Sequence, residues 1–425
     1  MNIITLGCSK NLVDSELLLG QLKANNITAF HESDNNSNVI VINTCGFIND
    51  AKQESIDTIL QYIEAKKAGL IEKIFVMGCL SQRYKNELKK EIKKIDGIYG
   101  VNELPEIVKD LGGNYNKTLV NNRYLTTPPH YAYLKIAEGC SRQCSFCAIP
   151  LIRGKYVSKP VNIIIDEAKI LAEKGIKEII LIAQDLTYYG IDLYKKRKLA
   201  DLLRKLSEIN GIDWIRLHYT YPAGFPIDVL DVMKEKDNIC NYIDIPLQHI
   251  SNSLLKSMRR GISGEETLKL INKIRNKIPD SAIRTTLIVG YPGETEQDFK
   301  ELKNFIIESK FDRLGIFTYS HEEDTPAYFL KDNIPEKIKQ QRADEIMQIQ
   351  QDISYQNNLK KVGNKFKILI DREEENYFIG RTEYDSPEVD NEVLIEKSEN
   401  NCRIGEFYII KITKADMFDL FGALI

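Results

Sequence analysis

Three cysteines stand close together in the segment Cys140-Ser-Arg-Gln-Cys144-Ser-Phe-Cys147. Three thiolates on one loop can hold three irons of a cubane iron–sulfur cluster, which leaves the fourth iron without a protein ligand. A structural zinc site would need a fourth Cys or His at nearby spacing, and none follows Cys147 in the next seventy residues. The spacing therefore predicts an iron–sulfur cluster with one open iron, rather than a zinc site or inert thiols.

Three further cysteines, Cys8, Cys45 and Cys79, each follow a short apolar run. The runs cover residues 2–6, 39–42 and 74–77 and alternate with helical patterns, which predicts a parallel sheet with crossover helices. Parallel strands bring their carboxyl ends to one edge, so we expect these cysteines, 37 and 34 residues apart, to meet there and hold a second cluster. Taken singly, each could be only a small buried hydrophobe, which is how we interpret Cys240 and Cys402.

The loop that begins at Cys140 follows the first strand of a larger α/β domain. Its strands are predicted at residues 133–137, 178–183, 214–219, 242–246, 283–289 and 313–318, with amphipathic helices between them. Six strand-then-helix units predict an incomplete version of the parallel α/β barrel, whose active site lies at the carboxyl ends of its strands. A polar connector over residues 112–129 separates this domain from the first.

A small all-β module is predicted after a charged helix over residues 335–360. Its strands fall at residues 366–370, 377–381, 392–395 and 407–412, enough for a five-stranded barrel if the N- or C-terminal stretch adds the fifth. A chain of 425 residues allows roughly three units at about 150 residues per domain. We therefore predict an α/β multidomain protein with domains at residues 1–113, 126–358 and 362–425.

The composition is that of a packed globular protein. Hydrophobic residues make up 43% and charged residues 28% of the chain, far from the signature of disorder. The first residues, Met-Asn-Ile-Ile-Thr-Leu, do not resemble a signal peptide, and no apolar run approaches a membrane span, so we expect a cytoplasmic protein without a membrane partner. Eight cysteines in a reducing compartment favour metal binding over disulfides.

The Cys140 loop, placed after the first strand of a six-unit barrel, resembles the radical S-adenosylmethionine (SAM) superfamily. The resemblance implies that the open iron binds SAM, that reduction of the cluster cleaves SAM to a 5′-deoxyadenosyl radical, and that Phe146 lies near the adenine. Simple loop packing of Phe146 is the alternative. The hard chemistry would belong to the cofactor, with the protein supplying position and exclusion of water.

Both cysteine groups and the β module together resemble the methylthiotransferase family, whose members join a three-cysteine domain, a radical SAM barrel and a C-terminal TRAM module. Four segments are similar to the RimO type, which methylthiolates the β-carbon of an aspartate in small-subunit ribosomal protein twelve: Thr5–Glu16, Cys147–Gly154, Pro246–His249, and Gly380–Thr382 through Asp385–Glu388. The resemblance implies two 4Fe-4S clusters, SAM and an external electron donor. It covers essentially the whole chain, with Ser9 a departure from the proline expected there.

Other residues at the predicted barrel rim are candidate SAM contacts. Gly290 and Glu294 end the fifth strand and resemble the segment that passes the adenine in this superfamily, although a plain strand-to-helix turn would need no ligand. Gln184 and Asp185 end the second strand, where cofactor contact and helix capping are equal alternatives. His249 could face the barrel mouth or be a hydrogen-bonded structural residue.

Two other functions share parts of this pattern. A transfer-RNA methylthiotransferase of the MiaB type would have the same architecture and clusters, and a non-catalytic iron–sulfur scaffold would leave SAM uncleaved. The module from residue 362 onward has eight Lys or Arg against fourteen Asp or Glu, a formal charge of −6, whereas nucleic-acid binding calls for basic surface. The charge favours a basic ribosomal protein as partner over transfer RNA.

Overall fold

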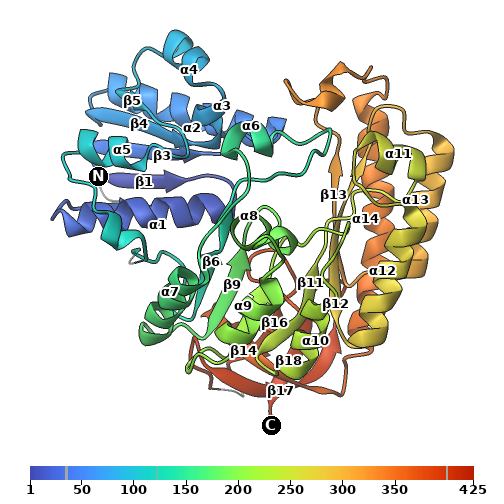
Figure 1. The fold of residues 1–425 in the computed structure, drawn as a ribbon. Coiled ribbons are helices and arrows are strands. Elements are labelled where there is room, and N and C mark those ends of the chain that lie inside the picture. The colour runs from blue at the N-terminus through green and yellow to red at the C-terminus, as the bar shows by residue number, and fades with distance from the viewer. Residues whose placement is uncertain (34–36, 122, 399–400) are drawn as a thin grey trace.

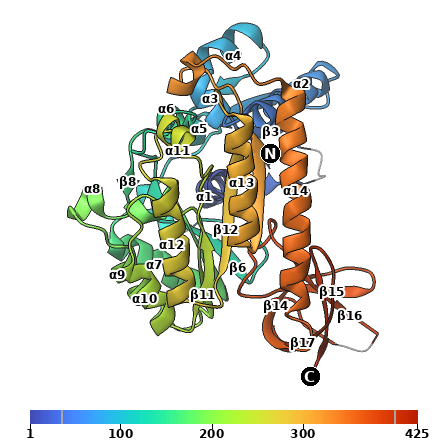
Figure 2. The same ribbon diagram turned by 90° about the vertical axis from the view of Figure 1, so that its right-hand side faces the viewer.

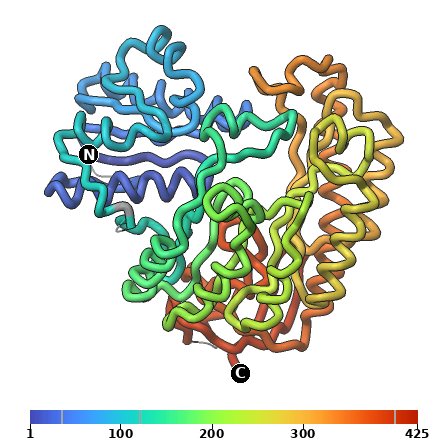
Figure 3. The backbone as a smooth tube through the Cα atoms, in the orientation of Figure 1, coloured from blue at the N-terminus to red at the C-terminus, as the bar shows by residue number. Residues whose placement is uncertain are grey.

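The computed structural model describes residues 1–33, 37–121, 123–398 and 401–425 as three units joined in chain order (Figures 1 and 3). The fold class predicted from the sequence is confirmed: two parallel α/β sheets are followed by a closed β-barrel. Among the described residues, no helix is both long and apolar enough to cross a membrane.

The N-terminal unit is a five-stranded parallel sheet in the order β2-β1-β3-β4-β5. Its strands are β1 (Asn2–Thr5), β2 (Phe30–His31), β3 (Val39–Thr44), β4 (Lys73–Gly78) and β5 (Gly97–Ile98). Its helices are α1 (Ser9–Ala24), α2 (Asn49–Lys67), α3 (Cys79–Arg83), α4 (Lys85–Glu91) and α5 (Leu104–Asp110), with the 3-10 turn Lys117–Asn121 after them. The three predicted strands form its centre, while the two-residue edge strands β2 and β5 are too short for any periodicity to reveal.

The central unit is a six-stranded parallel sheet in the order β13-β12-β11-β10-β9-β6. Its strands are β6 (Tyr131–Lys135), β9 (Glu178–Ile182), β10 (Trp214–Leu217), β11 (Ile239–Asp244), β12 (Ala282–Val289) and β13 (Arg313–Thr318). All six predicted strands are present, and their parallel pairing brings their carboxyl ends to one rim. A small antiparallel pair, β7 (Ala137–Glu138) and β8 (Val157–Ser158), extends beyond β6.

Helices cover the outer face of this partial barrel (Figures 1 and 2). Apart from α6 (Ile149–Arg153), which packs on α3 of the N-terminal unit, they are α7 (Val161–Glu173), α8 (Ile191–Tyr194), α9 (Leu199–Leu206), α10 (Asp228–Glu235), α11 (Asn252–Ser257), α12 (Gly264–Lys277), α13 (Glu296–Ser309) and α14 (Glu336–Leu359), with 3-10 turns at Leu186–Tyr188 and Pro326–Phe329. Two of them begin with capping boxes, Ser263 with Glu266 and Thr295 with Asp298, which satisfy the free N–H groups of their first turns.

The inner face of the partial barrel is filled by the other two units. Leu12, Val13 and Leu17 of α1 pack on inward side chains of β6 and β9, while Leu369 and Phe407 of the C-terminal unit pack beside Trp214 and its neighbours. An open six-stranded barrel cannot bury its own inner face, so neighbouring elements complete the core. The first helix of the chain therefore lies against the interior of the second unit.

The C-terminal unit is a closed barrel in the order β14-β15-β16-β18-β17. Its strands are β14 (Lys365–Glu373), β15 (Tyr377–Arg381), β16 (Val393–Glu396), β17 (Phe407–Ala415) and β18 (Leu420–Leu424). The fifth strand, left open by the sequence, is the C-terminal stretch. Closure by β18 removes the exposed edges that an open sheet would present.

Part of the acidic charge of this unit is buried against the barrel. Asp385 pairs with Arg313 of β13, and Asp390 lies 3.4 Å from Arg284 of β12. Asp371 accepts a contact from His130 at 2.8 Å. The formal charge of −6 therefore overstates the negative charge that a binding partner would meet on the surface of this unit, although the acidic run at residues 373–375 remains exposed.

The N-terminal sheet also touches the far side of the barrel. Glu322, in the segment after β13, is buried and accepts bonds from Lys52 of α2 at 2.9 Å and Arg83 of α3 at 2.6 Å. Figure 2 shows this orange segment beside the blue helices of the N-terminal unit. The chain thus anchors its first unit to both the first and the last strands of the barrel.

Candidate functional site

The Cys140 loop begins directly after β7, beyond the carboxyl end of β6, as the sequence predicted. The Cys140 N–H donates to the Gly154 carbonyl at 3.0 Å, which closes the loop into a ring. Gly139 has φ +75°, and a Cβ there would come within 2.2 Å of the Lys155 carbonyl oxygen. Only glycine permits this approach, so the residue before the first cysteine fixes the path of the loop.

Polar groups face the sulfur atoms of this loop. Arg260 donates to Cys144 Sγ at 3.2 Å, the Tyr221 hydroxyl lies 3.4 Å from the same sulfur, and the Arg142 N–H donates to Cys140 Sγ at 3.4 Å. Such contacts stabilise thiolates and tune an iron–sulfur cluster. The sequence did not reveal Tyr221, which follows β10, or Arg260, which lies between α11 and α12, because both are far from the cysteines along the chain.

Burial opposes ionisation of these thiols in the protein alone. It raises the pKa of Cys140 to about 11 and that of Cys147 to about 12. A bound metal centre overcomes this penalty because its positive charge holds the thiolate form. The donor set, three sulfurs with N–H and guanidinium groups around them, fits an iron–sulfur cluster.

The second group of cysteines converges at the carboxyl edge of the N-terminal sheet. Cys8 precedes α1, Cys45 follows β3, and Cys79 begins α3 directly after β4. A Cβ added to Gly7 would lie 3.0 Å from Cys45 Sγ, so the first two loops are in contact. Gly78, with φ +103°, brings the third loop against the carbonyl of Thr44.

Asn11 ties the three cysteine loops together. Its amide nitrogen donates to the Leu6 carbonyl at 2.7 Å and to the Thr44 carbonyl at 3.1 Å, and its oxygen accepts from Cys79 Sγ at 3.5 Å. One fully buried side chain therefore bonds to the loops of all three predicted ligands. Nothing in the spacing of the sequence singled it out, although it lies in the segment that carried the family resemblance.

Electrostatics differ among these three thiols. Burial opposes ionisation of Cys8, but the charges of Lys10 and Arg153 and nearby backbone N–H groups outweigh it and lower its pKa. Burial raises the pKa of Cys45, and it raises that of Cys79 to about 12. Among the described residues, no three Cys, His, Asp or Glu side chains converge closely enough to ligate a single metal ion. A cubane differs from a single ion because each thiolate binds a different iron.

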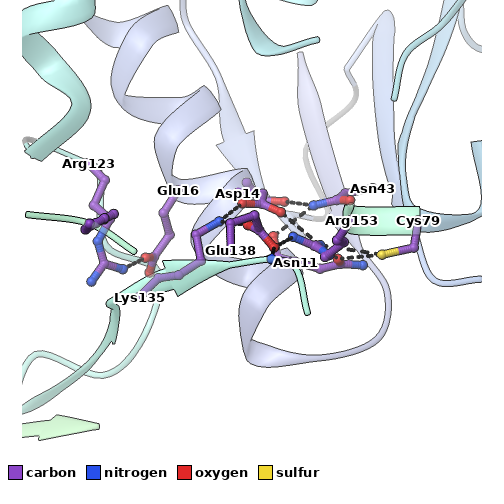
Figure 4. Close-up of polar contacts among 12 residues, drawn as sticks. Asn11, Asp14, Glu16, Asn43, Cys79, Arg123, Lys135, Glu138 and Arg153 are labelled. Carbon is purple, nitrogen blue, oxygen red and sulfur yellow. Dashed lines mark hydrogen bonds and ion pairs between the residues drawn. The ribbon is translucent and has the colours of Figure 1, made fainter. Parts of the chain in front are cut away.

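Arg153 connects the two cysteine groups (Figure 4). It ends α6, six residues after Cys147, and its buried guanidinium donates to Asn11 Oδ1 at 2.6 Å and Cys79 Sγ at 3.5 Å. The same group pairs with Asp14 and Glu138, each at 3.0 Å. The segment that carries the third cysteine of one group therefore reaches a sulfur of the other.

The predicted SAM contacts fall into two places. Gln184 lies beside the Cys140 loop, where its nitrogen donates to Glu138 at 2.8 Å and its buried oxygen has no hydrogen-bond partner among the described residues. Phe146 lies partly buried on an apolar cluster that includes Tyr291 and Met258. An orphaned acceptor and an apolar wall suit a cofactor with an ammonium group and an adenine.

Gly290 and Glu294 form a tight turn after β12. The Glu294 carboxylate is fully buried, and one of its oxygens is held by the Gly290 N–H and by Arg342 at 3.2 Å, while His249 Nε2 lies 3.6 Å from the other oxygen without a hydrogen bond. Glu294 therefore stabilises the turn through the protein's own groups, and His249 is a buried residue of the neighbouring segment between β11 and α11. Asp185, after β9, caps the 3-10 turn Leu186–Tyr188, and its carboxylate accepts a hydrogen bond from Arg142 at 2.8 Å.

Three family models match successive parts of the chain. Residues 1–100 match an uncharacterized protein family, UPF0004, residues 134–306 match the radical SAM superfamily, and residues 362–425 match the TRAM domain. Among solved structures, the radical SAM methyltransferase TsrM from Kitasatospora setae has a TM-score of 0.54 at 13% identity, covering 77% of this chain and 76% of its own. OxsB, a cobalamin-dependent SAM radical enzyme, has a TM-score of 0.51 at 12% identity, covering 82% and 55%. Both likenesses concern the fold alone.

Relatives similar over the whole length decide the family. A protein of Cytophaga hutchinsonii, named ribosomal protein uS12 methylthiotransferase RimO, is 61% identical over 100% of this chain and 98% of its own length. Proteins of the same name from Christiangramia forsetii and Phocaeicola vulgatus are 58% and 53% identical over 99% and 100% of this chain and 93% and 99% of their own. The chain belongs to the RimO family. This confirms the resemblance found in the sequence, and the MiaB type is not favoured.

Proposed function

We propose that this RimO-family chain is a radical SAM methylthiotransferase that modifies the β-carbon of an aspartate in ribosomal protein uS12. The observation that carries the proposal is the convergence of two three-cysteine groups, joined through Arg153, in a chain whose full length matches uS12 methylthiotransferases. One cluster would suffice for SAM cleavage. A second group of sulfur ligands beside the first fits a reaction that also transfers sulfur.

The cofactors are two 4Fe-4S clusters and SAM. We assign one cluster to Cys140, Cys144 and Cys147 and the other to Cys8, Cys45 and Cys79, with the domain boundaries predicted above. Cys140, Cys144 and Cys147 would hold the first cluster, which with SAM and an external electron donor would supply a carbon radical able to take hydrogen from an unactivated C–H bond. An acid–base pair would not serve there, because such a bond has no acidic proton.

The residues of the chain would bind and orient the cluster and SAM and shield them from water. Arg260 and Tyr221 bond the sulfur of Cys144, which fixes the loop that faces the barrel interior. Gln184 offers its free oxygen to a donor group of SAM, and Phe146 offers an apolar wall to its adenine. Gly290 allows the backbone to turn closely, while Glu294 holds that turn from within.

Contacts between the N-terminal unit and the barrel set the relative position of the two cysteine groups. Arg153 and Asn11 hold the N-terminal cysteine loops against the rim of the barrel. Packing of α1 on β6 and β9, and of the TRAM module at the amino-terminal ends of β10, β11 and β12, covers the barrel interior on those two sides. The TRAM module leaves an exposed acidic run for a basic ribosomal protein in the cytoplasm, free or within the small subunit.

Anaerobic turnover tests the function. Reconstituted protein is incubated with SAM, dithionite, sulfide and either uS12 or transfer RNA, and each product is analysed by mass spectrometry. We expect one methylthio unit on an aspartate of uS12. A methylthio unit on transfer RNA, with unmodified uS12, would contradict the assignment of substrate.

Variants of the two cysteine groups test the cluster assignment. Alanine at Cys140, Cys144 and Cys147 together should remove about half the iron and abolish deoxyadenosine formation. Alanine at Cys8, Cys45 and Cys79 should preserve deoxyadenosine formation and stop methylthio transfer. Unchanged SAM cleavage in the first variant, or full product from the second, would contradict the assignment.

A further inference from the structure

Lys10 is a buried cation at the junction of the first two units. It lies two residues after Cys8, in the first turn of α1, and only 7% of its surface is exposed. Its ammonium nitrogen stands 3.5 Å from the centre of the Tyr219 ring, just beyond the carboxyl end of β10. The side chain therefore reaches from the N-terminal cysteine group to the rim of the barrel.

Lys10 differs from the other buried lysines in having no carboxylate. Lys135 pairs with Asp14 and Glu138 at 2.5 and 2.7 Å, and Lys339 pairs with Asp332 at 2.8 Å. Across the described residues, the ammonium of Lys10 makes no hydrogen bond or ion pair, and its contact is the face of one ring. Buried charges are ordinarily paired, because an unpaired one loses its hydration without compensation.

The tyrosine under this ammonium is held in an unusual conformation. Tyr219 has φ +65°, which is disfavoured for a bulky residue. Its N–H donates to Asp244 Oδ2 at 2.9 Å, and its carbonyl accepts from the Leu186 N–H at 3.0 Å. Backbone of this kind persists where the surroundings enforce it, often in binding sites.

We propose that the Lys10 ammonium binds the side-chain carboxylate of the substrate aspartate. The inference rests on the proposed function, which requires an aspartate between the two cysteine groups. Lys10 lies beside one of those groups and reaches the barrel rim from which the other extends. A carboxylate placed on this ammonium would supply the missing counter-charge and position the adjacent β-carbon.

A counter-charge for the N-terminal cluster is the competing role. Lys10 contributes to that role at a distance, since its charge lowers the pKa of Cys8, but the direct contact with a sulfur is made by Arg153, whose guanidinium bonds Cys79 Sγ at 3.5 Å. The ammonium of Lys10 makes no hydrogen bond to sulfur in the described structure and lies on the ring of Tyr219 instead. Its position favours a partner that arrives in the barrel interior.

The test measures recognition of the carboxylate by the intact enzyme. The modified aspartate of uS12 is located by mass spectrometry of the wild-type product, and uS12 with Asn at that position is prepared. Affinities of both forms are measured for the reconstituted holoenzyme with SAM and without reductant, so that no turnover occurs. We expect wild type to prefer the aspartate form by about 10- to 100-fold, as for a charge-assisted hydrogen bond.

Substitution of Lys10 should abolish this preference. Lys10→Met and Lys10→Gln should bind both forms with a ratio near one, and Lys10→Arg should keep a preference. Lys23→Met is the matched control, because Lys23 lies on the same helix with its ammonium 3.0 Å from the centre of the Tyr124 ring but is exposed. The two uncharged variants keep the test usable if one misfolds.

The aspartate-to-asparagine ratio decides the outcome. A preference that persists in Lys10→Met and Lys10→Gln would overturn the proposal. An altered electron paramagnetic resonance spectrum of the N-terminal cluster, together with an unchanged ratio, would assign Lys10 to the cluster instead. Because wild-type turnover is measured separately, loss of the Lys10 role is distinguishable from failure of the uS12 assignment itself.

Discussion

Replacing Arg153 by Met should loosen the N-terminal unit from the barrel. Arg153 is buried and holds Asp14 and Glu138 at 3.0 Å each, together with Asn11 and Cys79. Removing one partner of a buried ion network costs about 3–5 kcal/mol, because the remaining charges stay buried and unpaired.

Lys135 limits the loss of docking free energy in Arg153→Met. It stays within 2.5 Å of Asp14 and 2.7 Å of Glu138, so both carboxylates keep one cation. We therefore expect the lower end of the range, about 3 kcal/mol, which corresponds to about 100-fold more frequent opening of the interface. Glu138 stays ionised in the wild type: burial opposes this, but Lys135 and Arg153 hold its pKa far below the ordinary value.

Hydrogen exchange of the reconstituted holoenzyme measures the opening directly. Amides of the first turns of α1 should exchange about 100-fold faster in Arg153→Met than in wild type, while amides of the TRAM barrel should not change. Arg153→Lys should give an intermediate rate, and Lys155→Met, an exposed neighbour, is the control. An acceleration of less than about threefold would refute the view that this network docks the domain.

Two further predictions concern the TRAM module. Replacing the exposed acidic residues 373–375 by lysine should weaken binding to uS12 about tenfold at low salt and reduce the salt dependence of binding. Replacing Glu301 and Glu308 on α13 by lysine is the control and should leave binding unchanged. Equal binding by wild type and the 373–375 variant would contradict this docking face. Burial opposes ionisation of Asp385, but Arg313 more than offsets it and lowers the pKa, so the pair stabilises the fold above about pH 4 and loses that contribution as pH falls. Asp385→Asn should therefore lower the free energy of unfolding at pH 7 by about 3 kcal/mol, measured by urea denaturation, and this difference from wild type should shrink below about pH 4. A difference that does not depend on pH would contradict the pairing.

The exposed and buried acids of the TRAM module illustrate a limit of composition. Counting charges predicted an acidic module, and the run 373–375 is indeed exposed. Asp371, Asp385 and Asp390 belong to the same count yet lie against basic groups of the barrel. A count treats all charges alike, whereas burial decides which of them a partner can meet.

The sequence by itself determined the elements and the grouping of the cysteines. Apolar periodicity is a local property, so the central strands and four of the five TRAM strands could be predicted, whereas β18 was left open and the two-residue strands β2, β5, β7 and β8 were missed. The spacing of Cys140, Cys144 and Cys147 lies within one loop, and the other three cysteines could be grouped because parallel strands end at one edge.

Only the tertiary structure decided which side chains surround those cysteines. Asn11 and Arg153 are 142 positions apart in the chain yet share a hydrogen bond, and Lys10 meets Tyr219 across an even larger separation. Contacts of this kind depend on how the first unit docks on the barrel, and no local pattern encodes that docking. The ligands of the site are therefore a property of short segments, whereas its electrostatics arise where the N-terminal unit meets the barrel.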